Sequence, residues 1–398
     1  MESLSRSRFL GLAAVTVLTM LPVTAVVPVL KPLIADRYGV RDLAASTFMS
    51  LNMLGALAGA PLAGWLSDRR GWTLRLLVPA AFADAALWAA MSSTPPFWVL
   101  SILRFLEGAA HIAVLSLLLA VASRGAGHGA RRMRTAAMGG AVVLGVAVGA
   151  PLGGLLGTPS PIVPLQTGAV VMVVVACCTM GLVPARGFVP RPDAHPRLPS
   201  LHAPPALRLP YLFAFVDRLS VGFFVYAFPM YAARVLRLEP SETGALIGVF
   251  MLPFALLCYP AGRLGAVLGQ WRLVLGGSLG YGIVYAAIPW LGEGTLWFAM
   301  VAGGLLSAVM FGPVLVLVLD ASDDATRASA MAGFNFAGSL GFLIGPLAAG
   351  ALLQLATPSA GVLGASRLTF AVGAASQLLA VLWALWRLRR GVRPTAAA

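Results

Sequence analysis

Three ionisable side chains stand close together in the stretch SILRFLEGAAHI, residues 101–112: Arg104, Glu107 and His111. On a helix, Arg104 and Glu107 are three residues apart and Glu107 and His111 are four apart, so all three lie on one face. The residues around them are almost all apolar. A guanidinium, a carboxylate and an imidazole on one face could together bind and release a proton. What this chemistry serves depends on the element that carries it.

That element is expected to be a membrane-spanning helix. The chain has 398 residues, of which 59% are hydrophobic and 11% charged, whereas soluble proteins are about a quarter charged. Apolar runs long enough to cross a hydrocarbon core of roughly 30 Å as helices recur along the whole sequence. They lack the alternating faces of barrel strands. The sequence therefore predicts an all-α polytopic membrane protein.

The apolar runs divide into two sets of six. We expect twelve spans, near 9–33, 44–66, 73–92, 96–121, 135–157, 161–184, 209–233, 242–265, 271–291, 294–319, 328–354 and 366–388. The segment between the sixth and seventh spans is rich in Pro and Arg and has no helical period, which is typical of a polar linker. We therefore predict an N-terminal six-helix bundle over 1–184, a cytoplasmic linker over 185–208 and a C-terminal six-helix bundle over 209–398.

Short sequences repeat between the two halves. RTAAMGG (134–140) corresponds to RASAMAG (327–333), and GAPLGG (149–154) corresponds to GPLAAG (345–350). Each pair enters the equivalent span of its half. Two such repeats are typical of secondary transporters, whose substrates bind between the repeats near the middle of the membrane.

The positive charge is explained by membrane topology. The net charge is +14, only Lys31 is a lysine, and most arginines lie in the segments that share a side with the N-terminus. The positive-inside rule then places the linker and both termini in the cytoplasm, and we expect the plasma membrane (the inner membrane of a bacterium). The first apolar run lacks a cleavage site and should remain as a helix. We expect no nucleic-acid partner.

Other charges also fall within apolar runs: Asp84, Asp217 and Arg218. A charge at the bilayer centre costs at least about 2.5–3.5 kcal/mol and normally faces a cavity or a partner. We take these three, with Arg104, Glu107 and His111, as candidates for proton coupling and for lining a water-filled substrate cavity. Asp84 could instead be a structural partner for a neighbouring helix. His111 could be a proton relay or a hydrogen-bonded structural histidine.

The stretch GWLSDRRGWTLRLL, residues 64–77, resembles the loop motif that follows the second helix in the major facilitator superfamily. Gly64, Asp68, Arg69 and Gly71 match that motif, and Trp72 departs from it. Gly64 would permit close helix approach and Gly71 a tight turn. The resemblance covers the whole chain. It implies that these four residues latch the cytoplasmic side in the outward-facing state.

Two further stretches support the resemblance. Arg104 followed by Gly108 is similar to a family motif that takes part in proton coupling. The stretch GVAVGAPLGGLLG, residues 145–157, resembles the Gly/Pro motif of proton-driven antiporters, although Ala150 departs from it. Its candidate residues are Gly145, Gly149, Pro151, Gly153 and Gly154. The same glycines could simply allow close helix packing, whatever the direction of transport.

The resemblance implies a transporter with twelve helices in two six-helix repeats. We expect proton-coupled export of a small amphipathic molecule by alternating access, and the alternative is uptake or facilitated transport of a metabolite or lipid-like substrate. The expected partners are a small-molecule substrate, protons and the lipid bilayer, and we expect a monomer. Because the sequence lacks HExxH and any Cys/His cluster, we expect no enzyme activity, no metal and no cofactor.

Overall fold

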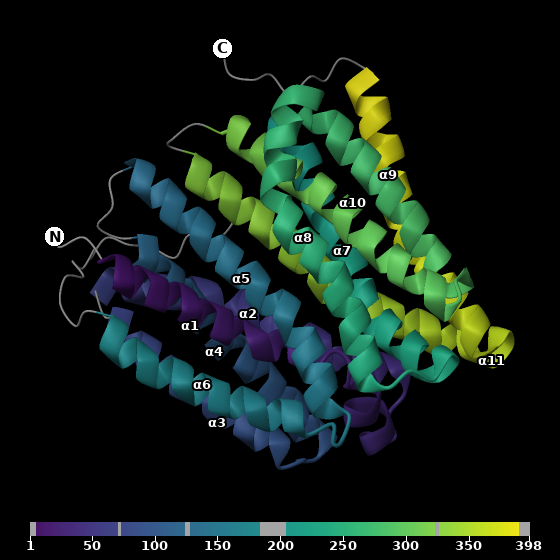
Figure 1. The fold of residues 1–398 in the computed structure, drawn as a ribbon, viewed down its shortest axis with the longest axis horizontal. Coiled ribbons are helices and arrows are strands. Elements are labelled where there is room, and N and C mark those ends of the chain that lie inside the picture. The colour runs from purple at the N-terminus through teal and green to yellow at the C-terminus, as the bar shows by residue number, and fades with distance from the viewer. Residues whose placement is uncertain (1–4, 71–72, 124–127, 184–203, 323–325, 390–398) are drawn as a thin grey trace. The chain divides into compact units, whose positions relative to one another are not determined.

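The computed structural model describes residues 5–70, 73–123, 128–183, 204–322 and 326–389. In these residues it is built from helices, eleven of which are long and apolar enough to cross a membrane (Figure 1). The first half holds α1 Arg6–Ala25, α2 Asp42–Arg70, α3 Thr73–Ser92, α4 Phe97–Ser123, α5 His128–Gly157 and α6 Val163–Leu182. The second half holds α7 Pro205–Tyr231, α8 Pro240–Leu268, α9 Gln270–Ala287, α10 Glu293–Asp320 and α11 Arg327–Arg389. Short helical turns complete the description: η1 Lys31–Asp36, η2 Ala232–Leu236 and η3 Ile288–Trp290.

The helix α11 contains the last two predicted spans. It is 63 residues long and is broken at Gly361, whose φ of 68° and ψ of 173° are not helical. Glycine has no Cβ and adopts a positive φ without strain. The predicted break over 355–365 is therefore reduced to a kink at one residue. With α11 counted as two spans, the predicted fold of twelve membrane helices in two six-helix repeats is confirmed.

The helices form two compact units. Unit 1 comprises Met1–Leu33, Leu51–Leu198 and Pro240–Gly244, and unit 2 comprises Ile34–Ser50, Pro199–Glu239 and Ala245–Ala398. The units thus differ from a simple division at the linker in two short segments: residues 34–50 belong to unit 2, and residues 240–244 belong to unit 1. In unit 2, the start of α2 is held by an ion pair between Asp42 and Arg234. In unit 1, Ser241 N donates to Thr158 Oγ1 at 3.1 Å.

Equivalent helices pack in the same way in the two units (Figure 1). In unit 1, α1 packs on α5 and α6, and α3 packs on α4 and α6. In unit 2, α7 packs on α11, and α9 packs on α10 and α11. These pairings agree with the sequence repeats, because the fifth span of each half meets the first span of that half.

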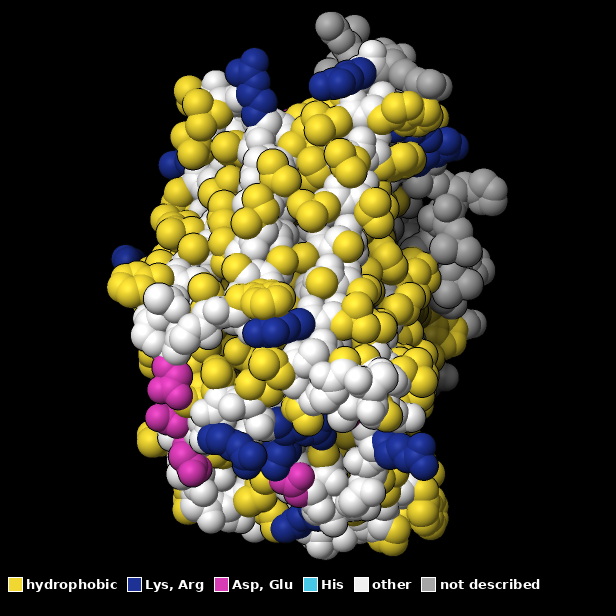
Figure 2. All heavy atoms as spheres, turned by 90° about the vertical axis from the view of Figure 1, so that its right-hand side faces the viewer, with side chains coloured by type: hydrophobic (Ala, Val, Ile, Leu, Met, Phe, Trp, Pro, Cys, Tyr) yellow, Lys and Arg dark blue, Asp and Glu magenta, His cyan; other side chains and the backbone are white. Residues whose placement is uncertain are grey.

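Apolar side chains face outward over the helices. Figure 2 shows one face on which hydrophobic side chains cover most of the surface and the acidic ones gather toward one end. Val267, Phe298 and Leu355 are among the most exposed, at 82%, 77% and 75%. An apolar exterior of this kind suits contact with lipid. Charged side chains buried inside such a protein are costly, so they mark candidate functional sites.

Candidate functional site: a buried charge cluster in unit 1

The site is built where α2 crosses α4 at small residues. A Cβ on Gly108 would collide with the backbone of Asn52, and a Cβ on Gly55 would collide with the backbone of Phe105. A Cβ on Gly59 would lie 2.7 Å from the Cα of Ala109. Only glycine allows helix backbones to approach this closely. The close crossing places the Asn52 side chain beside the charged face of α4.

Glu107 receives two donors on one oxygen. Arg104 Nη1 donates to Glu107 Oε2 at 2.8 Å, and Asn52 Nδ2 donates to the same atom at 2.7 Å. The guanidinium of Arg104 also lies over the ring of Trp88, 5.3 Å from its centroid. Arg104 and Glu107 are both 0% exposed. These charges were expected to line a water-filled cavity, and the structure encloses them between helices instead.

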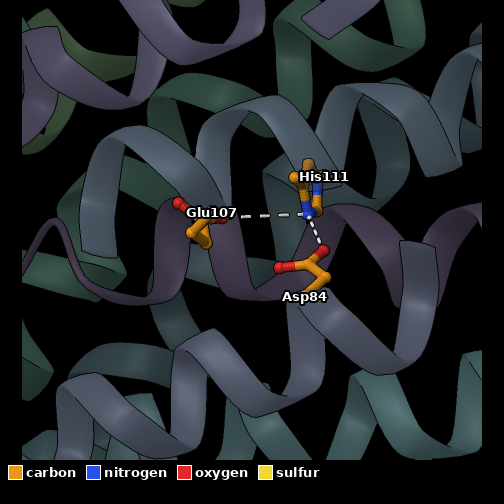
Figure 3. A group of neighbouring side chains, drawn as sticks. All are labelled: Asp84, Glu107 and His111. Atoms are coloured by element: carbon orange, nitrogen blue, oxygen red, sulfur yellow. Dashed lines mark hydrogen bonds and ion pairs between the residues drawn. The ribbon is translucent and has the colours of Figure 1, made fainter. Parts of the chain in front are cut away.

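His111 lies between two carboxylates from different helices (Figure 3). Its Nδ1 is 2.8 Å from Asp84 Oδ2 on α3 and 3.9 Å from Glu107 Oε1 on α4. Within the described residues, Asp84 Oδ1, Glu107 Oε1 and His111 Nε2 are buried without a hydrogen-bond partner. We call Asp84, Arg104, Glu107 and His111 the charge cluster.

A charge count distinguishes the ions that the cluster could bind. Asp84, Glu107 and His111 offer ligand atoms within 4.8 Å of one another, so a metal ion is a geometric candidate. With neutral His111, the four residues of the charge cluster carry a formal charge of −1. One proton brings this to zero, whereas a divalent cation would leave +1. Uncompensated charge is costly in a low-dielectric interior, so the cluster is better matched to a proton.

Asp217 and Arg218 lie on α7 in unit 2 and do not join the charge cluster. Asp217 is 8% exposed, its Oδ1 lacks a hydrogen-bond partner among the described residues, and its Oδ2 is 3.6 Å from Arg218 Nε. The Arg218 guanidinium lies over Phe311, 4.9 Å from the ring centroid. Asp217 borders a small pocket that is lined also by Phe213, Ala214, Ser278, Met310, Phe311, Val314 and Phe334.

The predicted latch residues are only partly described. The side chains of Asp68 and Arg69, and the whole of Gly71, lie outside the described residues. A Cβ on Gly64 would have no described atom within 4 Å. Among the described residues, Gly64 therefore makes no close helix contact, and the latch role of this motif stays a prediction.

The glycines of α5 pack against α1. A Cβ on Gly145 would lie 2.5 Å from Val17 O, and Cβ atoms on Gly149 and Gly153 would collide with the backbones of Leu21 and Ala25. Gly154 meets Pro240 and Gly244 in the same way, and Pro151 lies inside the helix. In unit 2, Gly341 and Gly345 of α11 make equivalent contacts with Phe215 and Leu219 of α7. This packing therefore occurs in both repeats.

Asn52 was missed by sequence reasoning. It is a lone amide in the apolar stretch LNMLGALAGA, residues 51–60, and that polarity was the available signal. A buried amide in a membrane span needs partners for its donors and acceptor. The partner, Glu107, is 55 residues away in the chain, so it could not be identified from the sequence.

Comparison with known proteins agrees with this architecture. The sequence profile described as Major Facilitator Superfamily matches twice, over residues 12–210 and 210–397. The 3-(3-hydroxy-phenyl)propionate transporter of Escherichia coli K12 is 27% identical over 348 residues, covering 84% of this chain and 83% of that protein.

Solved structures share the fold. A bacterial homologue of the human lysosomal transporter Spinster, inward-facing and occupied, superposes with a TM-score of 0.80 at 14% identity and covers 100% of both chains. A D-xylose–proton symporter gives a TM-score of 0.76 at 14% identity, over 99% of this chain and 100% of that one. The chain belongs to the major facilitator superfamily and is a membrane transporter, not an enzyme.

Proposed function

We propose that this transporter couples the movement of a small amphipathic organic molecule to protons by alternating access, and that the charge cluster carries one proton. The observation that carries the proposal is the balance of charge: Asp84, Arg104 and Glu107 sum to −1 around the imidazole of His111. A proton on His111 gives a buried cluster with no net charge. Loss of that proton leaves −1 and favours a rearrangement that admits water or a cation.

The substrate class is proposed from chemistry and from the 27%-identical relative. That relative is named for an aromatic carboxylate, which is small and amphipathic, so 3-(3-hydroxyphenyl)propionate is the first substrate to test. The aromatic residues Phe213, Phe223 and Phe224 of α7 are compatible with such a molecule. We propose that the protein acts as a monomer in the plasma (bacterial inner) membrane, with both termini in the cytoplasm.

Export and uptake remain two versions of this proposal. The α5 glycine motif favoured export. Because equivalent glycine packing occurs in unit 2, that motif is equally suited to a role in helix packing, which does not depend on direction. Uptake or facilitated transport is the second candidate, because this glycine packing suits either direction of transport. The sign of the coupled fluxes distinguishes the two.

The test is flux in proteoliposomes under an imposed pH gradient. Wild type should accumulate the labelled substrate only while the gradient lasts, and a protonophore should abolish the accumulation. Substrate and protons moving in the same direction indicate symport, and opposite directions indicate export by exchange. Glu107→Gln, Asp84→Asn and His111→Gln should each lose the response to the gradient while still inserting in the membrane.

Ser101→Ala is the matched control, because Ser101 lies on α4 and its hydroxyl donates to Phe97 O, one turn away on the same helix, at 2.9 Å. It should keep wild-type flux. Gradient-driven transport that persists in all three cluster variants would assign the cluster a structural role. Asp217→Asn would then test the buried carboxylate on α7.

A further inference from the structure

We infer that Asn52 is a positioning residue for proton coupling: it holds one oxygen of Glu107 so that the other stays aimed at His111. This inference rests on the proposed proton coupling and adds a residue and a step to it. Asn52 Nδ2 lies 2.7 Å from Glu107 Oε2, which is also the acceptor for Arg104. With Oε2 fixed by two donors, the carboxylate cannot rotate freely.

The free oxygen of Glu107 is placed to compete with Asp84. Among the described residues, Glu107 Oε1 has no hydrogen-bond partner. It lies 3.9 Å from His111 Nδ1, whereas Asp84 Oδ2 lies 2.8 Å from the same nitrogen. An approach of about 1 Å would bring Oε1 within hydrogen-bond distance. The imidazole N–H can then leave Asp84 and donate to Glu107. The proton stays on the nitrogen, and only the hydrogen bond is exchanged.

Among the described residues, the carboxylates that face His111 are Asp84 of α3 and Glu107 of α4. Arg104 of α4 and Asn52 of α2 contact Glu107 in turn. Asn52 lies outside the charge cluster and is uncharged, so replacing it changes no formal charge. Any change in the proton binding of His111 on its removal must act through geometry or through the lost hydrogen bond to Glu107.

Histidine NMR tests this inference without relying on transport. The chain has 4 histidines, so protein labelled with ¹⁵N-histidine gives few signals, and His111→Gln identifies the one of interest. Asn52→Leu keeps the shape of the side chain and removes the donor. Without the amide, Glu107 can turn away from the imidazole. The titration midpoint of His111 should fall by about one pH unit, the scale of a hydrogen bond to a charged group.

Two controls make the result specific. Thr47→Val is a control on the same helix, α2. The Thr47 hydroxyl donates to Ala44 O in its own turn at 2.6 Å, so this variant should leave the midpoint unchanged. In a Glu107→Gln background, Asn52→Leu should no longer shift the midpoint, because its effect passes through the carboxylate. Asn52→Ala replaces Asn52→Leu if the latter does not fold.

An unchanged midpoint in Asn52→Leu, or an equal shift in the two backgrounds, would overturn the inference. Wild-type flux under a pH gradient is measured on the same preparation. If that flux is absent while the midpoint still shifts, the proposed proton coupling fails and the positioning of Glu107 by Asn52 stands. If flux is present and the midpoint does not shift, the proposed proton coupling stands and the positioning of Glu107 by Asn52 fails.

Discussion

Arg234 Nη1 lies between the two carboxylate oxygens of Asp42, 2.8 Å from Oδ1 and 2.9 Å from Oδ2. Tyr226 donates its hydroxyl to Oδ1 at 2.9 Å. The Asp42 side chain is 11% exposed and that of Arg234 is 22% exposed. These contacts join the first residue of α2 to α7 and η2 within unit 2. Leu43 N, which donates to Gln354 Oε1 at 3.2 Å, extends the anchor to α11.

Breaking this ion pair should destabilise unit 2. Arg234→Ala leaves the Asp42 carboxylate buried without its cation, which should cost about 2 kcal/mol of unfolding free energy, or roughly 4–8 °C in melting temperature. The measurement is thermal unfolding of the purified protein in detergent. The exchanged pair Asp42→Arg with Arg234→Asp should recover part of the loss. Recovery should be incomplete, because an acidic side chain suits a helix N-terminus and a basic one does not. If the exchanged pair is no more stable than Arg234→Ala, the ion pair does not stabilise unit 2.

The glycine crossing of α2 and α4 should tolerate no side chain. Gly55→Leu would place atoms where the Phe105 backbone lies and should cost about 1–3 kcal/mol or more. The yield of monodisperse protein after membrane extraction reports this. Gly64→Ala on the same helix is the control, because its Cβ would enter open space, and it should change stability by less than about 0.5 kcal/mol. Equal damage at the two positions would mean that close packing is not what Gly55 provides.

The latch motif predicts an effect on conformational populations. If Asp68 helps to close the cytoplasmic side, Asp68→Asn should slow transport while substrate still binds, since the change removes charge without altering size. Initial flux and equilibrium binding of the same labelled substrate separate these quantities. Asp320→Asn, another acidic residue near a helix end, serves as a comparison. A normal transport rate in Asp68→Asn would exclude the latch role.

The arginine distribution predicts where the linker and the C-terminus lie. Single cysteines introduced as His195→Cys or Thr395→Cys, in a chain lacking Cys177, Cys178 and Cys258, should resist a membrane-impermeant thiol reagent added to intact cells. They should react once the membrane is permeabilised. Labelling in intact cells would reverse the proposed orientation.

Properties that depend on neighbouring residues in the chain could be predicted from the sequence. The length and apolarity of each run specify a membrane helix, and the separation of Arg104, Glu107 and His111 specifies one polar face, because helix geometry is local. The repeats between the halves indicated two six-helix bundles. The family assignment rested on the same short motifs and is confirmed.

The partners of that polar face were decided only by helix packing. Asp84 is 27 residues from His111, and Asn52 is 55 residues from Glu107. Nothing in the spacing distinguishes Asp84, which joins the charge cluster, from Asp217, which lies in the other unit. The position of Asn52 follows from Gly55, Gly59 and Gly108, whose missing side chains let two backbones meet. Which helices meet, and at what register, is a property of the whole packed bundle, because each crossing depends on complementary surfaces from segments far apart in the chain.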